Sequence, residues 1–161
     1  MKPASVLLSA ALGLASAGAL AQGADNWIVS ETTSPVDYTP MLIATTYARR
    51  GQDGAAMQFS IHCRAGRVEL VVAGSTVTRR GEEYAITYRV NDGAPVQVPA
   101  GTPSSGTGAA FGGDVVRLLR SLPEDGTLAV RLSTRQGAAQ EGQFSLSGLK
   151  AVRDKVSAAC K

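Results

Sequence analysis

Hydrophobic and polar positions alternate with a period of two along most of the chain, which predicts a domain built mainly from β-strands. The clearest alternation lies in "MQFSIHCR" at 57–64 and "RVELVVAG" at 67–74, which we expect to form a hairpin around Ala65 and Gly66. The same pattern predicts further strands at 27–29, 41–49, 84–92, 94–100, 127–135 and 143–148. The Gly- and Ser-rich segment 101–113 is expected to be a surface loop, with a short strand near Ala109.

Two segments have helical instead of alternating spacing. We expect a short helix at 115–122 with Asp114 as its N-cap, and a closing helix at 148–160 with Ser147 as its N-cap. Asp92-Gly93 predicts a two-residue hairpin turn. Seven or eight short strands with turn signals between them favour an antiparallel β-sandwich or barrel-like domain, with a short internal helix and a C-terminal helix.

The chain has only two cysteines, Cys63 and Cys160. Cys63 shares the apolar face of its strand with Phe59 and Ile61, and Cys160 continues the apolar stripe of the closing helix. Both thiols therefore point toward one core, and we expect a disulfide that ties the last helical turn to a central strand. Two buried free thiols are the alternative.

The first residues predict export. Lys2 precedes an apolar stretch, and "ALA" at 19–21 supplies the small residues that a signal peptidase accepts. We expect 1–21 to be a signal peptide cut after Ala21, leaving 22–161 as one periplasmic or secreted domain without a stable membrane span. The net charge is only +3, and the basic residues are scattered, so we expect no nucleic-acid partner.

Candidate chemistry is sparse. His62 is the single histidine, and its position beside Cys63 places it on the opposite face of the strand. We find no nucleophile motif and no set of metal ligands, so we expect no enzyme activity, no cofactor and no metal site. Trp27, Arg89 and Asp92 are the candidate binding residues, because Trp and Arg often anchor interfaces. The alternative places Trp27 in the core and Arg89 in a local ion pair.

A set of short motifs recurs in a known order. They are "W-x-V" at 27–29, "SPVD" at 34–37, "LIA" at 42–44, "FSIHCRAGRVELVV", "YAITYRVNDGAP", "LAVRLST", "FSLSGLKAV" and a final "AAC". In this order the chain resembles the small periplasmic type VI secretion-associated proteins of the TagO/VasI family. It departs from that pattern at Asn91, where the family tends to carry Asp, and in "VQVPAGTPSS", which lacks the family's tryptophan. The resemblance implies a cysteine bridge, a β-rich fold and a non-catalytic role in the cell envelope.

Three hypotheses follow for function. The first is an envelope accessory protein that binds a protein partner, with peptidoglycan as the other candidate partner. The second is a periplasmic inhibitor of an envelope hydrolase such as lysozyme, with the loop at 101–113 inserted into the target's cleft. The third is a hydrolase built around His62.

Overall fold

The structure, a computed structural model, describes residues 26–49, 56–75 and 83–161. The expected signal peptide at 1–21 and its cleavage site after Ala21 lie outside these residues. The described part contains nine strands and two helices, which are β1 (Ile28–Thr33), β2 (Pro40–Tyr47), β3 (Gln58–Arg64), β4 (Arg67–Ala73), β5 (Tyr84–Val90), β6 (Val96–Gly101), β7 (Ala109–Phe111), α1 (Val115–Ser121), β8 (Thr127–Thr134), β9 (Ala139–Ser145) and α2 (Leu149–Ala159).

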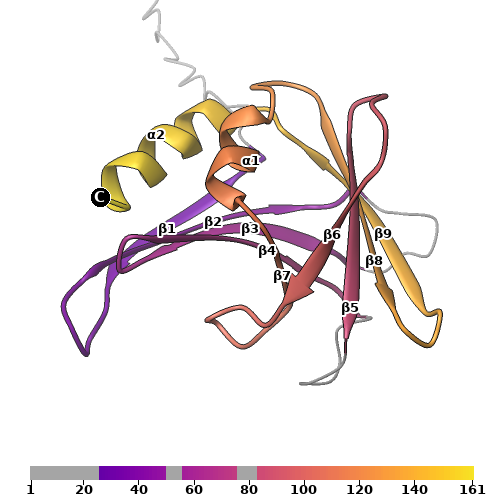
Figure 1. The fold of residues 1–161 in the computed structure, drawn as a ribbon. Coiled ribbons are helices and arrows are strands. Elements are labelled where there is room, and N and C mark those ends of the chain that lie inside the picture. The colour runs from indigo at the N-terminus through magenta and orange to yellow at the C-terminus, as the bar shows by residue number, and fades with distance from the viewer. Residues whose placement is uncertain (1–25, 50–55, 76–82) are drawn as a thin grey trace, which may run out of the picture.

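The nine strands form one antiparallel sheet that bends at β7 into a first wing, β1–β4, and a second wing, β5, β6, β8 and β9. The strand order is β1-β2-β3-β4-β7-β6-β5-β8-β9. Strands β1 to β4 lie in one layer, and β5, β6, β8 and β9 cross that layer steeply (Figure 1). The short β7 pairs with both β4 and β6 at the bend, and the two helices lie on the same side of β1–β4. The prediction of a mainly β, antiparallel fold with two helices is confirmed.

The two wings meet again at the far end of β2. The Arg49 backbone N–H donates a hydrogen bond to the Gln143 carbonyl of β9 at 3.0 Å. A side chain on Gly142 would not fit there, because its Cβ would lie 2.9 Å from Met57 Sδ and 3.1 Å from Ala48 Cβ. The close approach at Gly142 lets the sheet curl partly into a barrel, with the core between the wings.

Phe59 of β3 lies at the centre of that core. Its ring centroid is 6.0 Å from that of Trp27, 5.9 Å from that of Phe111 and 5.8 Å from that of Phe144. These three rings come from the residue before β1, from β7 and from β9. Aromatic contacts of this kind add stability beyond the burial of their area, so Phe59 links both wings of the sheet.

A disulfide joins Cys63 of β3 to Cys160 at the end of α2, with 5.8 Å between the two Cα atoms. Leu149, Val152 and Val156 form the buried stripe of α2, which rests on the inner face of the sheet. The predicted bridge is therefore confirmed, together with the reason for it: both sulfur atoms lie on apolar faces that pack against each other.

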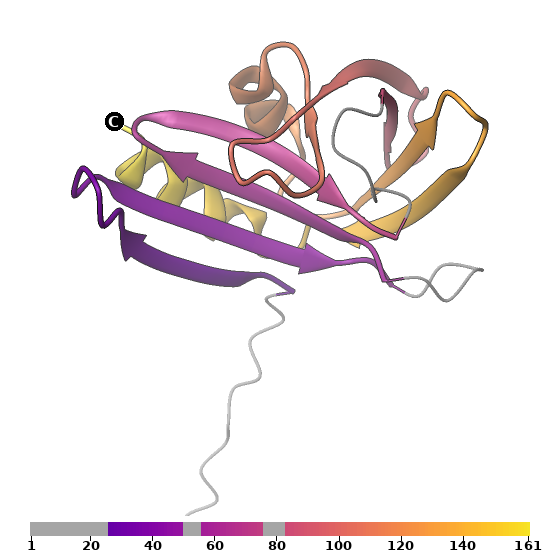
Figure 2. The same ribbon diagram turned by 90° about the horizontal axis from the view of Figure 1, so that it is seen from below.

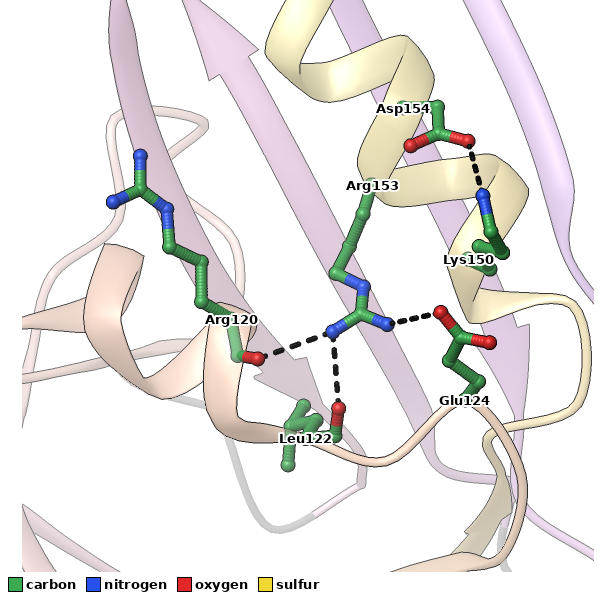
Figure 3. Close-up of polar contacts among 6 residues, drawn as sticks. All are labelled: Arg120, Leu122, Glu124, Lys150, Arg153 and Asp154. Atoms are coloured by element: carbon green, nitrogen blue, oxygen red, sulfur yellow. Dashed lines mark hydrogen bonds and ion pairs between the residues drawn. The ribbon is translucent and has the colours of Figure 1, made fainter.

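Arg153 fixes α2 against the end of α1 (Figure 3). Its Nη1 donates to the carbonyl oxygens of Arg120 and Leu122 at 3.1 Å each, and its Nη2 lies 3.3 Å from Glu124 Oε1. Leu122 is the C-cap of α1, so a cation here satisfies carbonyl groups at the negative end of that helix. The guanidinium group thus links α2 to the end of α1 through polar contacts.

The caps of the two helices were predicted with unequal success. Asp114 is the N-cap of α1, and its side chain accepts a hydrogen bond from the Arg117 backbone N–H at 2.9 Å, as expected. The expectation that Ser147 caps α2 is wrong. The N-cap is Gly148, with φ at 86° and no side-chain hydrogen bond. The chain needs a left-handed residue to turn from β9 into α2, and glycine adopts that conformation without strain.

The predicted two-residue turn at Asp92-Gly93 is also wrong. The last residues of β5 and β6 that pair with each other are Tyr88 and Val96, well before the turn. Beyond Tyr88 the strand continues to pair with β8 on its other side, and Asn91 then turns the chain with φ at 49°. Pairing with β8 outweighs the local preference of the Asp-Gly pair.

The loop between β6 and β7 lies on the outer face of β4. The Ser104 backbone N–H and hydroxyl both donate to Glu69 Oε2, at 3.1 and 2.7 Å. Pro103 is buried, and Val71 on the outer face of β4 is only 3% exposed. The short strand expected near Ala109 is present as β7, but the preceding residues are held against the sheet by Glu69.

Candidate functional site

Trp27 lies in the core. Its side chain is 7% exposed and packs edge-on against Phe59, so it is not part of the accessible surface. Its indole Nε1 has no hydrogen-bond partner among the described residues. Of the two sequence-based interpretations of Trp27, the structure agrees with the core residue.

Arg89 and Asp92 are both exposed, but they do different things. Arg89 points outward from β5, and Asp92 lies in the turn that follows. The local ion pair that was the alternative interpretation of Arg89 does not occur in the part of the chain that the structure describes. The carboxylate of Asp92 and the guanidinium of Arg89 therefore remain available to solvent or to a ligand.

His62 lies on the outer face of β3, opposite Cys63, as expected. It is half-buried between Ile43 of β2 and Glu69 of β4, its neighbours in the sheet register. Burial lowers the pKa of the imidazole below its ordinary value of 6.5, and the nearby Glu69 carboxylate opposes that shift. Because the Glu69 carboxylate also accepts the hydrogen bonds from Ser104, it serves to hold the β6–β7 loop.

The β1–β2 hairpin concentrates the exposed apolar surface. Six large hydrophobic side chains of the described residues are exposed, and four of them belong to this hairpin: Ile28, Val36, Tyr38 and Tyr47. Val36 and Tyr38 are by far the most exposed, at 83% and 81%. They lie in the connection between the strands, which projects from the end of the sheet (Figure 1). By the strand register, Ile28 and Tyr47 lie at the opposite end of the hairpin, so the candidate interface is the pair Val36 and Tyr38 at its tip.

Hydrogen bonds hold this connection, the 34–39 tip, in a single shape. The buried Ser34 donates its backbone N–H to the Thr39 carbonyl at 2.9 Å and accepts the Tyr38 N–H at 3.0 Å. The Thr39 hydroxyl donates to Asp37 Oδ1 at 2.8 Å. Hydrogen bonds from Ser34 and Thr39 lower the pKa of Asp37 to about 2, so this carboxylate is ionised at any physiological pH.

The backbone of Tyr38 is strained, and its side chain gains no packing contacts in return. Its φ is 55°, in the left-handed region that bulky residues seldom adopt, although its ring is almost fully exposed. Strained residues of this kind collect at binding and switch sites. The sequence signal for this feature is a pair of large apolar residues set among turn-forming Ser, Asp, Thr and Pro in "SPVDYTP". From the sequence, 34–37 was singled out only as the SPVD motif, and Tyr38 was given no role.

The outer edge of β1 is open. Strand β1 ends the sheet, and in the described part of the chain no strand pairs with its far side. Figure 2 shows β1 along the rim of the sheet, with α2 behind the strands. Strand β1 contains no proline, and its single charged residue, Glu31, lies 3.0 Å from Lys155 Nζ of α2. An edge with so little protection can accept another strand.

Within the described residues there is neither a cluster of metal ligands nor a helix that could span a membrane. No three or more His, Cys, Asp and Glu side chains within 26–49, 56–75 and 83–161 are grouped so that they could hold a metal ion. Neither helix in these ranges has the length and apolar character needed to cross a membrane.

Comparisons of the chain with models of known protein families, with curated protein sequences and with solved structures found no match.

Proposed function

We propose that this protein is a non-catalytic accessory protein of the cell envelope that binds a protein partner through its β1–β2 hairpin. The observation that carries the proposal is that Val36 and Tyr38, the two most exposed large hydrophobic side chains of the described residues, both lie at the tip of that hairpin. Tyrosine at the tip suits this role, because its ring offers a large contact area for few rotatable bonds.

The rigidity of the 34–39 tip supports binding by a preformed surface. A loop that already holds its bound shape loses little conformational entropy when a partner arrives. The hydrogen bonds among Ser34, Asp37 and Thr39 supply that order before any contact is made. The strain at Tyr38 is then the cost of presenting its ring outward.

The open edge of β1 supports the same surface. An extended segment of the partner can pair with the free N–H and carbonyl groups of β1, while the tip supplies side-chain contacts at one end. Main-chain pairing of this type gives affinity, and the side chains on the tip give selectivity.

The Cys63–Cys160 disulfide supports an oxidising compartment, since such bridges persist outside the reducing cytosol. Together with the expected signal peptide and the resemblance to TagO/VasI proteins, it favours the periplasm over the cytosol. The inhibitor and hydrolase hypotheses stay predictions, and no contact in the structure favours either one over partner binding.

A photo-crosslinking amino acid at position 36 in the full chain tests the proposal in native cells, with position 116 on α1 as the matched exposed control. We expect a protein adduct from position 36 and not from 116. The partner, once identified and purified, should bind the Tyr38→Asn variant at least about tenfold more weakly, as for an interface anchor.

Tyr38→Asn is a sharp variant because asparagine tolerates the left-handed backbone. The free energy of unfolding should stay equal or rise by up to about 1 kcal/mol, since an exposed ring is removed and strain is relieved. Val116→Ala should change neither binding nor stability. Equal adducts from both positions, or unchanged binding by Tyr38→Asn, would contradict the proposal.

A further inference from the structure

The outer face of the second wing carries a hollow of about 170 Å³. It lies over β5, β8 and β9, and it is lined by Thr87, Tyr88, Arg89, Pro95, Ala129, Arg131 and Glu141. At roughly 30 Å³ for each water molecule, this space suits a small polar group rather than a whole cofactor.

The strand register explains the hollow. Ala129 of β8 lies between Arg89 of β5 and Gln143 of β9, and the row beside it places Arg131 between Thr87 and Glu141. Paired residues of neighbouring strands point to the same face, so the methyl group of Ala129 is surrounded by five longer side chains. Ala129 is only 8% exposed because those longer side chains rise around it.

The two arginines of the hollow have no anionic partner. Neither Arg89 nor Arg131 forms an ion pair with any described residue, and Glu141, directly across from Arg131, forms none either. Arg89 and Arg131 are diagonal neighbours, about 7–8 Å apart at the backbone, a span that two guanidinium groups can close around one anion.

We propose that this hollow binds a carboxylate presented by a peptide. A carboxylate is planar, and arginine donates to it through two parallel N–H groups. The Thr87 hydroxyl lies in the same row as Arg131 and can donate a further hydrogen bond. Glu141 at the rim repels a second negative charge and accepts a donor, so a peptide with amide N–H groups beside its carboxylate fits better than a phosphate dianion.

The proposal rests on residues other than those of the β1–β2 hairpin, and it can fail without affecting the proposed function. It is tested by titrating the full ¹⁵N-labelled chain with four probes while the NMR signals of the arginine Nε–H groups and of the Ala129 amide are monitored. The probes are acetyl-Gly-Glu-Gly-amide, acetyl-Gly-Gly-Gly with a free carboxylate, acetyl-Gly-Gln-Gly-amide and inorganic phosphate.

We expect the signals of Arg89, Ala129 and Arg131 to shift saturably with a carboxylate peptide, with a dissociation constant in the millimolar range. A response to the Glu peptide assigns the site to acidic side chains, a response to the free terminus assigns it to chain ends, and either supports the proposal. Equal shifts with the neutral Gln peptide, a stronger response to phosphate, or no shift with any probe would overturn it.

Matched variants distinguish a specific site from a general attraction of anions to basic residues. Arg89→Gln and Arg131→Gln should each weaken binding at least fivefold, whereas Arg117→Gln, an exposed arginine on α1, should leave it unchanged. Ala129→Val fills the floor without altering charge and should also weaken binding. If Arg117→Gln reduces binding as much as Arg89→Gln, the hollow is not a specific site.

Discussion

Cys63 and Cys160 connect the middle of the sheet to the end of the last helix, across 97 residues of sequence. The Cys63 side chain is 1% exposed and sits among core residues, whereas Cys160 is the C-cap of α2, where a helix would otherwise fray. The bridge therefore converts the least secure turn of α2 into a fixed part of the core.

Removal of this bridge should destabilise the protein strongly. In the chain-entropy account, closing a loop of this length stabilises the folded state by about 4–5 kcal/mol. Urea unfolding of the oxidised chain and of a Cys63→Ala/Cys160→Ala variant measures the difference. Amide exchange of α2 should also speed up in the variant. A reducing agent should act on the natural chain and leave the variant unaffected, and equal unfolding midpoints for the two chains would contradict the prediction.

Arg153→Ala should cost about 1–3 kcal/mol of unfolding free energy. The substitution removes charge-assisted hydrogen bonds to two carbonyl groups at the end of α1, and the Arg153 side chain is only 19% exposed. Lys150→Ala, in the same helix, is the control (Figure 3). Lys150 pairs with Asp154 in a largely exposed i,i+4 contact, so its loss should cost no more than about 0.5 kcal/mol. Thermal unfolding of both variants decides the matter, and similar losses would show that Arg153 has no special role.

Gly142→Ala should destabilise the curled sheet by about 1–3 kcal/mol, in the range of core overpacking. The added methyl group would meet the Met57 sulfur and the Ala48 Cβ, and the Ala48 backbone N–H is held by a hydrogen bond to the Met57 carbonyl at 2.9 Å. Gly101→Ala is the matched control, because a Cβ at this strand position has no atom within 4 Å. Urea unfolding should show the loss in the first variant only. A neutral Gly142→Ala would mean that the wings are looser at this point than their contacts indicate.

The stability of the protein should fall as the pH drops through the ordinary pKa of histidine. Burial lowers the pKa of His62 in the folded state, so below about pH 6.5 the unfolded chain binds a proton that the folded chain resists. The folded state is therefore fully favoured above about pH 7.5 and loses stability as the pH falls, until His62 is protonated in both states.

His62 is the only histidine of the chain, which makes the test clean. Urea unfolding of the natural chain and of His62→Gln should be compared between about pH 8 and pH 5, where no other unperturbed side chain titrates. The slope of the unfolding free energy against pH should disappear in the variant. The same slope in both proteins would assign it to other groups.

The sequence predicted those features that depend on a local period. Cys63 and Leu70 alternate with polar neighbours, and Val152 and Val156 recur at helical spacing, so the buried faces and the disulfide could be derived without coordinates. The missed features depend on pairing between distant segments. Strand β8 decides where β5 ends, and Glu69 decides where the β6–β7 loop lies, and neither contact leaves a mark in the local pattern.

The candidate sites were harder to predict than the fold, for the same reason. Arg89 was a candidate from the sequence, but its neighbours Arg131 and Glu141 become visible only through the register of β5, β8 and β9. Tyr38 was missed, and Val36 entered only as part of the SPVD motif, because the local pattern does not show which way an apolar side chain in a turn points. Only the hydrogen-bonded course of the 34–39 tip shows that both side chains point into solvent.

The bridge from Arg49 to Gln143 makes the two rims of the sheet unequal. Strand β9 meets the backbone of Arg49 at its outer side, while β1 keeps its outer side vacant within the described residues. A protein with two vacant rims can add copies of itself without limit and form a fibre. A protein with one vacant rim can form only a dimer by strand pairing. The Arg49–Gln143 bridge occupies one residue of the β9 rim, so within the described residues β1 is the rim that is vacant along its whole length.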